Sequence, residues 1–541
     1  MTSNSQDIIQ DIRTECEMLL DFVTNEKAQK ATADHIERSL FRRLLKLGAR
    51  LLLLFLVTRA QNCSREPLEL EGGQELPYHS EKKRTYSSIF GKLAFWRPYF
   101  YKTGVEGQSP LDAELSLGSD CYSDLLREMS AYLGVYAAYS KAIDIEERLL
   151  DVKLSTRVLQ QVIASDAADV QAFYAQKPAP LPAAEAEILV IQADGKGVPM
   201  VLETPAEPKM RLGKGQKRGR KKEAIVTTVY TIAAAPRTPE QVVASFFYQD
   251  RGTASEQGSS KRTKPQNKHI WATLEGKDTA LARLAKQVAP RQGSHILQQV
   301  ALCDGCEALQ SRIETQFPDF NLILDFIHPN EYLWKVANSL LGETSELRTE
   351  WVAKQTLLML SGQTAQIITE FRRLAQDAQH TSAQREKLIK TANYFQRNLP
   401  YMDYPTYLAQ GWPIASGVIE GACRHFVKDR FELSGMRWTQ EGAENLLHLR
   451  AVAENEDWDD YHHFRKRQRH ARLYTLPFPE QGSLDDQVLD LNMPFNAPQE
   501  SQVPTQTNSE PEPFLGYESS PMTATLNSDR YQGYYELPLA V

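Results

Sequence analysis

The sequence predicts an α/β fold that follows a mostly helical N-terminal region and contains a helical insertion. Between residues 183 and 330, apolar segments with strand character are interleaved with helical ones, as in α/β sheets. From Glu331 to about Leu399 the apolar periodicity is that of helices. Residues 7–62 show the same helical pattern. These three observations decide the fold class.

The same patterns divide the chain into regions, with the proline-rich segment 178–182 as a linker. The tail is rich in Pro, Gln, Ser and acidic residues and is predicted to be mostly disordered. The regions are an N-terminal helical region (1–84), a β-hairpin followed by helices (85–177), the first part of the α/β core (183–330), the helical insertion (331–410), the second part of the core (411–475) and the tail (476–541).

Individual elements can be predicted as well. Gly72-Gly73 and the polar stretch to Thr85 read as a break, and residues 85–104 as a β-hairpin around Gly91-Lys92. The segment 151–163 resembles the turn and second helix of a helix-turn-helix, although an ordinary helix pair is commoner. The other expected elements are strands at 187–193, 224–233, 268–274, 297–303 and 321–327, and helices at 277–288, 416–433 and 439–455.

Composition indicates a water-soluble protein. The chain has 541 residues, a net charge of −7, 24% charged and 42% hydrophobic residues, enough for several domains. Six cysteines are too few for a disulfide scaffold, so a cytoplasmic location is expected. The apolar run 51–57 is far shorter than the roughly 20 residues that a membrane span needs, so we expect no membrane association.

Three acidic residues form the candidate metal site. Asp194 and Asp304 each follow an apolar strand and precede a glycine, and Glu420 lies on a predicted helix. Carboxylates are the ligands that Mg²⁺ or Mn²⁺ prefers, and two such ions can activate and stabilise the oxygens of a phosphodiester. An Asp-Gly pair after a strand is often only a turn. Likewise, Glu420 could simply occupy a first helical turn capped by Ser416 and pair with Arg424.

Further residues are candidates for supporting roles. Asp325 and His328 end the next strand, where they could bind a metal or orient a carboxylate; a histidine that caps the following helix is the alternative. Asp325 also competes with Asp304 as the second aspartate. Trp438 could stack on an unpaired base, or be a core anchor. Other acidic competitors are Asp319, Glu432 and Glu444.

Several short motifs together resemble those of ISKra-type bacterial insertion-sequence transposases, which belong to the DDE superfamily and are similar to Mutator-type enzymes. The resemblance covers roughly residues 85–475. The motifs are Ala-Asp194-Gly-Lys-Gly, Val-Tyr230-Thr, Lys-His-Ile-Trp271-Ala-Thr-Leu, Cys-Asp304-Gly, Leu-Asp325-Phe-Ile-His328-Pro-Asn-Glu-Tyr-Leu-Trp, Gly417-Val-Ile-Glu420-Gly-Ala-Cys and Gly435-Met-Arg-Trp438-Thr.

The resemblance implies an RNase H-like core with a helical insertion before the catalytic glutamate. It gives Asp194, Asp304 and Glu420 the catalytic, metal-binding positions, and matches Asp325 and His328 to a downstream Asp-x-x-His element. It implies cleavage at the ends of an insertion sequence and transfer into target DNA, with two Mg²⁺ or Mn²⁺ ions. A homodimer or larger assembly on DNA, near the nucleoid, is the corresponding expectation.

Clusters of basic residues suggest where DNA would bind, because phosphate contacts need only positive charge and reach. A solvated surface loop is the alternative for each cluster. Arg465–Arg472 is a third basic run, near the end of the folded part. The predicted DNA contacts are Lys214, Lys217, Arg218, Arg220, Lys221 and Lys222 in the first run, Lys261, Arg262, Lys264 and Lys268 in the second, and Arg424 and Lys428 beside the glutamate.

Other functions remain open at this stage. A nuclease on the same scaffold would cleave DNA without joining it. A transposase relic retained as a DNA-binding regulator would bind without cleaving, and a structural helical protein would do neither. The acidic trio argues against the regulator, and the basic runs argue against the structural protein.

Overall fold

The computed structural model describes residues 5–70, 74–201, 221–248 and 264–479. All of its helices and strands belong to one compact unit. The predicted tail lies outside the described residues from 480 onward, as do Lys214, Lys217, Arg218, Arg220, Lys261 and Arg262. No helix in the described ranges combines the length and the apolar character needed to cross a membrane.

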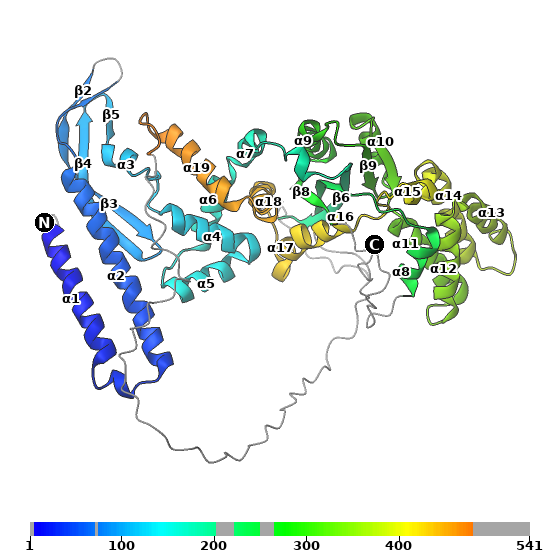
Figure 1. Ribbon diagram of the computed structural model, residues 1–541, viewed down its shortest axis with the longest axis horizontal. Coiled ribbons are helices and arrows are strands. Elements are labelled where there is room, and N and C mark those ends of the chain that lie inside the picture. The colour runs from blue at the N-terminus through cyan, green and yellow to red at the C-terminus, as the bar shows by residue number, and fades with distance from the viewer. Residues whose placement is uncertain (1–4, 71–73, 202–220, 249–263, 480–541) are drawn as a thin grey trace, which may run out of the picture. The chain divides into compact units, whose positions relative to one another are not determined.

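A five-stranded mixed sheet forms the centre of the fold, which confirms the α/β prediction (Figure 1). Its strand order is β8-β7-β6-β9-β10: β7 pairs antiparallel with both β8 and β6, and β9 and β10 run parallel to β6. The strands are β6 (Ile188–Pro199), β7 (Lys221–Ile232), β8 (Gln266–Thr273), β9 (Gln298–Cys303) and β10 (Asn321–Leu324). All five coincide with predicted strands, but β6 continues beyond its predicted end.

Helices cover both faces of the sheet. On one face, α9 (Lys277–Val288) and α10 (Glu307–Gln316) bury Leu281, Leu284 and Ile313 against β6 and β9. On the other face lies a larger core built mainly by the helical insertion. That core includes α8 (Pro239–Phe247), α11 (Ile327–Leu341), α12 (Leu347–Leu360), α13 (Thr364–Leu374), α14 (Ser382–Asn398) and α15 (Tyr404–Ala409).

Two of these helices differ from expectation. Helix α8 was not predicted; Thr238 begins it with a complete capping box and Pro239 occupies its first turn. Helix α11 starts at Ile327, so the predicted strand 321–327 ends three residues early.

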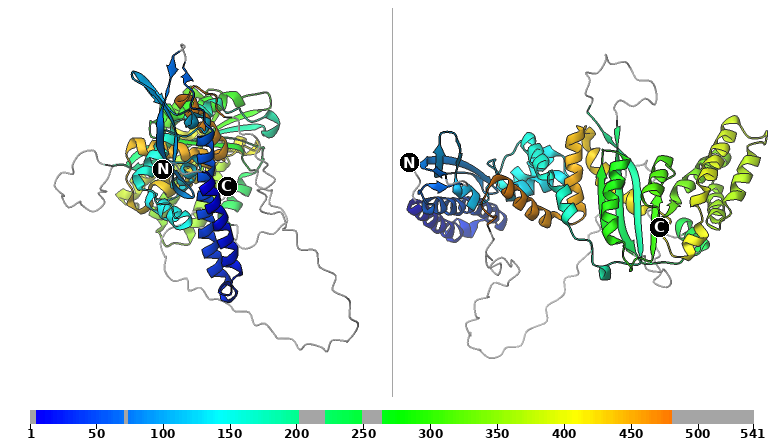
Figure 2. Two further views of the ribbon diagram at one scale, coloured as in Figure 1. Left: turned by 90° about the vertical axis from the view of Figure 1, so that its left-hand side faces the viewer. Right: turned by 90° about the horizontal axis from the view of Figure 1, so that it is seen from above.

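The N-terminal region begins with a pair of adjacent helices, α1 (Ser5–Thr24) and α2 (Ala33–Asn62), drawn in dark blue in Figures 1 and 2. A three-stranded sheet of β3 (Tyr78–Ser88), β4 (Gly91–Lys102) and β5 (Val105–Gln108) packs on α2 through β4. The predicted break is therefore wrong from Tyr78 onward: β3 includes the four consecutive charged residues 81–84, and the strand is largely solvent-accessible. Gly72-Gly73, at the start of the predicted break, lies outside the described residues. Smaller elements are β1 (Leu68–Glu69), β2 (Glu75–Leu76) and α3 (Pro110–Glu114).

A bundle of helices then leads to the central sheet. It contains the predicted helix pair α5 (Tyr139–Leu150) and α6 (Thr156–Ala167), joined by a turn at Asp151. Leu159, Val162 and Ile163 of α6 are buried against α4 and α18. The bundle comprises α4 (Asp124–Tyr136), α5, α6, α7 (Val170–Gln176) and α18 (Gln440–Glu454). Short 3₁₀ turns occur at Ala28–Lys30, Pro182–Ala184, Ala289–Arg291, Leu399–Tyr401 and Leu433–Gly435.

The third basic run forms helix α19 (Trp458–Leu473), and most of its arginines face the protein. Arg465 is buried and donates to the fully buried Asp166 at 3.0 Å and to Asp124 at 3.1 Å. Arg469 also pairs with Asp124, and Arg472 pairs with Asp169. Arg465, Arg469 and Arg472 attach α19 to the helical bundle, whereas Arg467 of the same run is exposed, and DNA binding by this run stays a prediction.

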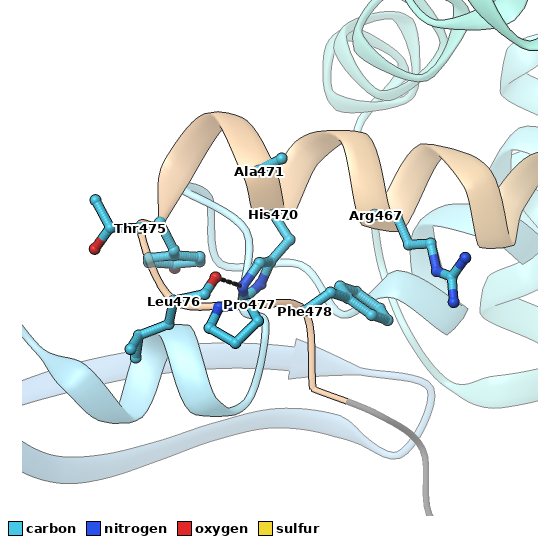
Figure 3. A pocket seen from close by; sticks show the side chains of 8 residues that line it. Arg467, His470, Ala471, Thr475, Leu476, Pro477 and Phe478 are labelled. Carbon is cyan, nitrogen blue, oxygen red and sulfur yellow. Dashed lines mark hydrogen bonds between the residues drawn. The ribbon is translucent and has the colours of Figure 1, made fainter.

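After α19 the chain turns back on itself (Figure 3). The His470 ring bonds the Leu476 carbonyl oxygen at 2.8 Å, and Phe478 lies beside the ring of His470 and the guanidinium of Arg467. Arg467 itself is exposed.

Arg465 is buried whereas Arg467 is exposed, and this difference in burial leads to a prediction about stability. We expect Arg465→Ala to lower the free energy of unfolding by about 2 kcal/mol or more, since Asp166 then keeps only one buried partner, Arg127. Arg467→Ala should change it by less than about 0.5 kcal/mol. Urea titrations followed by circular dichroism measure both. Equal effects of the two substitutions would contradict the buried network.

Candidate functional site

Three aspartates occupy equivalent positions on β6, β9 and β10, because these parallel strands are paired in one register. Ala193 is paired with Cys303, and Cys303 with Leu324. The next residue on each strand is an aspartate: Asp194, Asp304 and Asp325. Neighbouring strands are about 4.8 Å apart, so Asp304 lies between the other two. Asp194 is not at a strand end, because β6 continues its pairing with β7 as far as Pro199.

The three side chains share one face of the sheet, since residues two apart along a strand point the same way. Leu302 and Ile323, two positions before Asp304 and Asp325, both lie in the core of the insertion helices. Gln192, two positions before Asp194, is buried and its Oε1 accepts a hydrogen bond from the Ile419 amide at 3.0 Å. Gln192 thereby fixes the segment that carries Glu420 over this face.

Glu420 lies on α16 (Gly417–Gly421), the start of the predicted helix. The helix continues as the π-helical segment η5 (Ala422–Lys428) and ends in α17 (Asp429–Phe431). The Cys423 thiol, on η5, donates to Oδ2 of Asp194 at 3.3 Å. Such π-helical segments are rare and often occur at functional sites; here the segment attaches the glutamate helix directly to the first aspartate.

Asp325 has a different environment from the other two aspartates. It is fully buried, Oδ1 accepts the Ile327 amide at 3.0 Å, and Oδ2 accepts the Ser416 hydroxyl. The neighbouring Phe326 amide donates to the Ile414 carbonyl at 3.0 Å. These bonds tie the beginning of the helical insertion to its end. Ser416 was expected to cap the glutamate helix; its hydroxyl instead binds Asp325.

Ligand atoms of Asp325, His328 and Glu420 all lie within 4.8 Å of one another. Oxygen ligands on opposite sides of Mg²⁺ are about 4.2 Å apart, so this trio could hold one ion after small movements. The trio differs from the predicted set of Asp194, Asp304 and Glu420. Both Asp325 oxygens accept hydrogen bonds, but so do both Asp194 oxygens, from the Gly195 amide and the Cys423 thiol. Hydrogen bonding therefore does not choose between Asp304 and Asp325 as the second aspartate. We keep Asp304 as the candidate ligand because it follows the residue that pairs next to Asp194 across the sheet, and we give the fully buried Asp325 a positioning role.

The charges of these groups act on one another. Burial raises the pKa of Asp304, and the nearby Asp194 carboxylate raises it further. Burial also raises the pKa of Glu420, with added repulsion from Asp325 and Asp194, whereas His328 opposes the rise. Proximity of half-buried carboxylates is unfavourable without a cation. The donor set of carboxylates with one imidazole therefore fits a hard divalent ion such as Mg²⁺ or Mn²⁺.

The insertion helices form a border of this site that the sequence did not reveal. Tyr332 of α11 and Tyr394 of α14 stack with ring centroids 4.1 Å apart. A Cβ added to Gly305 would come within 2.5 Å of the Tyr394 ring, so glycine is required after Asp304. Arg397 donates to the Gly305 carbonyl oxygen. These contacts join residues distant in sequence, and no local signal could have predicted them; the same is true of Gln192 and Cys423.

Trp438 belongs to the core rather than to a DNA-facing surface. Its side chain is buried, its ring nitrogen donates to the Phe431 carbonyl at 3.1 Å, and Arg430 lies over its ring. Its amide donates to the Pro199 carbonyl at 3.0 Å, next to the end of β6. The core-anchor alternative is therefore the one that the structure favours.

The other acidic residues that were considered as metal ligands make different contacts or lie elsewhere. Glu444 accepts from the Thr273 hydroxyl and the Leu274 amide at the end of β8. Glu432 pairs with Lys221, and Asp319 is exposed in a turn before β10. Among the described ion pairs there is none between Glu420 and Arg424. Glu420 does lie in the first turn of α16 after the N-cap residue Ser416, as the local alternative expected.

Six of the predicted DNA contacts can be located. Lys221 pairs with Glu432, and Lys222 donates to Gln440 at 2.7 Å. Arg424 and Lys428 are exposed on η5, the segment that follows Glu420. Lys264 and Lys268, on and just before β8, are exposed as well. Positive charge thus lies on the elements that carry the acidic residues or adjoin them.

Comparison with models of known protein families and with curated proteins found no match for this sequence.

The site geometry leads to a prediction about metal binding. We expect Asp304→Asn and Glu420→Gln each to lower Mn²⁺ affinity by about tenfold or more. A lost charge beside a divalent ion costs more than about 1.4 kcal/mol even at an effective dielectric constant of about 20. Isothermal titration calorimetry on the purified chain measures this, with Asp319→Asn as a control that should bind like wild type. Unchanged affinity in Asp304→Asn together with loss in Asp325→Asn would make Asp325 the ligand.

Proposed function

We propose that this protein is a metal-dependent DNA transposase with an RNase H-like catalytic core. The observation that carries the proposal is the shared register of β6, β9 and β10, which sets Asp194 and Asp304 side by side beneath the helix of Glu420. The mixed sheet, with three antiparallel strands followed by two parallel ones, supports the RNase H-like core that the resemblance implies.

In this proposal Asp194, Asp304 and Glu420 bind two divalent ions, and Asp325 and His328 support them. Bound Mg²⁺ supplies the chemistry by lowering the pKa of a nucleophilic water or 3′-hydroxyl and neutralising charge on the leaving oxygen. The protein's own contribution is positioning. Gln192 holds the backbone of α16, Cys423 orients the Asp194 carboxylate, and Asp325 keeps the two ends of the insertion together.

Positive charge near this site supports nucleic acid as the substrate. Arg424 and Lys428 are exposed on the segment after Glu420. Lys221 and Lys222 begin β7, whose Val226 pairs with Asp194 of β6. Lysine and arginine at such positions can bind phosphates on either side of a scissile bond. The whole chain has a net charge of −7, so this positive charge is a local feature of the region.

The chemistry can be tested by isosteric substitution. Asp194→Asn and Glu420→Gln should abolish Mg²⁺-dependent cleavage of DNA that carries the element's ends, while binding of that DNA persists. Each substitution removes one charge from the ion site and hardly alters shape. Cleavage assays and gel shifts on the same samples give both quantities, with Asp319→Asn as a matched control. Mg²⁺-dependent cleavage by either variant would contradict the assignment.

The products separate the proposal from its alternatives. A transposase yields molecules in which the cleaved 3′ end is joined to target DNA, whereas a nuclease with the same site yields only nicked or cut DNA. A DNA-binding regulator would bind the ends without cutting them. Sequencing of the reaction products distinguishes the three.

The basic run at 214–222 should bind the phosphate backbone. Replacing Lys217, Arg218, Arg220 and Lys221 by Ser should weaken binding about equally for end DNA and random DNA. The salt dependence should flatten by about one unit of slope per lost phosphate contact, because each contact releases a counterion. Affinities measured at several salt concentrations decide this. A loss confined to end DNA would mean that the run recognises sequence.

A further inference from the structure

Helix α2 carries a regular row of leucines on its surface. Leu40, Leu44, Leu47, Leu51 and Leu54 follow one another at alternating spacings of four and three residues. Leu44 is 49% exposed and Leu51 48%, and the flanking Phe41 and Phe55 are 48% and 49% exposed. We call these seven side chains the leucine stripe. Large apolar residues gathered in this way on a surface usually mark a binding site.

The opposite side of α2 already has its partners within the chain. Leu56, Val57 and Ala60 are buried in a core with Ile8 of α1 and Phe95 of β4. Lys46 and Arg50 form ion pairs with the buried Glu15 of α1. Within the leucine stripe, Leu54 packs against this core. Phe41, Leu44, Leu51 and Phe55 do not belong to the core, and about half of each of these side chains stays exposed to water.

The spacing of the leucines on α2 indicates that the partner of the leucine stripe is another helix. Apolar residues that alternate at four and three residues keep one seam facing a second helix, as in coiled coils. Because α2 has 30 residues and α1 has 20, they are about 45 Å and about 30 Å long. With helices about 10 Å wide, the outer faces offer on the order of 750 Å², close to the roughly 800 Å² that each partner of a stable complex buries.

The charges on α1 and α2 indicate that the α1–α2 pair of a second copy is a suitable partner. Helix α1 has five acidic side chains and one arginine, whereas α2 has six lysines or arginines and two acidic residues. Two copies related by a two-fold axis can place α1 of one against α2 of the other with opposite charges facing. Exposed groups that stay available for this include Glu17 and Asp21 on α1 and Arg42 on α2.

We propose that the α1–α2 pair is a dimerisation surface that binds the same pair of a second copy through the leucine stripe. This inference does not rest on the proposed catalytic function, because no residue of the acidic site takes part. If the proposed function holds as well, the surface supplies the two copies that joining two DNA ends requires.

The test is the oligomeric state of the full chain without DNA or metal, measured by sedimentation equilibrium. Wild type should be a dimer. Leu44→Gln combined with Leu51→Gln should raise the dissociation constant about 100-fold or more, since each substitution removes a half-exposed leucine from both copies and costs roughly tenfold per position. The two side chains are half exposed, so the fold should persist, as circular dichroism would show. Leu297→Gln replaces a leucine that is 69% exposed elsewhere and should leave the dimer unchanged.

Three outcomes would overturn the inference. One is a monomeric wild-type chain, and another is a dimer that the Leu44 and Leu51 substitutions do not weaken. The third is a monomer that dimerises only after removal of residues 480–541, which would mean that the chain's own tail covers the leucine stripe. Metal-dependent cleavage is measured separately, so failure here leaves the proposed function standing, and the reverse also holds.

Discussion

The register of three parallel strands is the constraint on which the candidate site depends. Side chains alternate along a strand, so a slip of one residue would turn an aspartate to the opposite face. Pairing of Ala193 with Cys303 and of Cys303 with Leu324 places all three aspartates on the insertion face at one level. The same alternation points Gln192 toward the glutamate segment, where it accepts the Ile419 amide. The sheet thus positions the carboxylates and also anchors the helix above them.

The carboxylates of the candidate site repel one another, and they differ in burial and in hydrogen bonding. Asp325 is fully buried, but both of its oxygens accept hydrogen bonds, and those bonds close the insertion at its base. Asp304 and Glu420 remain partly accessible, and burial, with added repulsion from neighbouring carboxylates, raises their pKa values. Burial raises the pKa of Asp325 as well. Asp194, Asp304 and Glu420 are the partly accessible carboxylates, where a divalent ion can bind. Full burial separates Asp325 from Asp194 and Asp304, although the sequence contexts of the three are similar.

Much of the central sheet could be predicted from sequence, because buried strands appear as apolar runs that end at Asp-Gly or Asp-Phe. Helix α9 even has its predicted bounds. Strand β3 could not, since its charged, accessible face carries no apolar run. Asp304 follows a strand end and Glu420 lies on a helix, as predicted, whereas Asp194 lies within β6 and not at its end. The order of the aspartates across the sheet follows only from pairing. Gln192, Ser416, Cys423 and Tyr394 act through contacts far apart in sequence, where no periodicity exists to detect them.

Basic runs show why composition alone cannot assign a DNA surface. Arg465–Arg472 and the segment around Arg424 look alike in sequence, yet Arg465 meets two buried or half-buried carboxylates while Arg424 is exposed. Asp166 is a counter-ion of Arg465 and has no access to water. If Arg465 bound a phosphate instead, the carboxylate of Asp166 would lose this partner while remaining buried, which is unfavourable. An exposed arginine loses only water and mobile ions when DNA arrives. What distinguishes a structural cation from one that can bind DNA is therefore the burial of its partner, and that depends on α4 and α6, some 300 residues earlier in the chain.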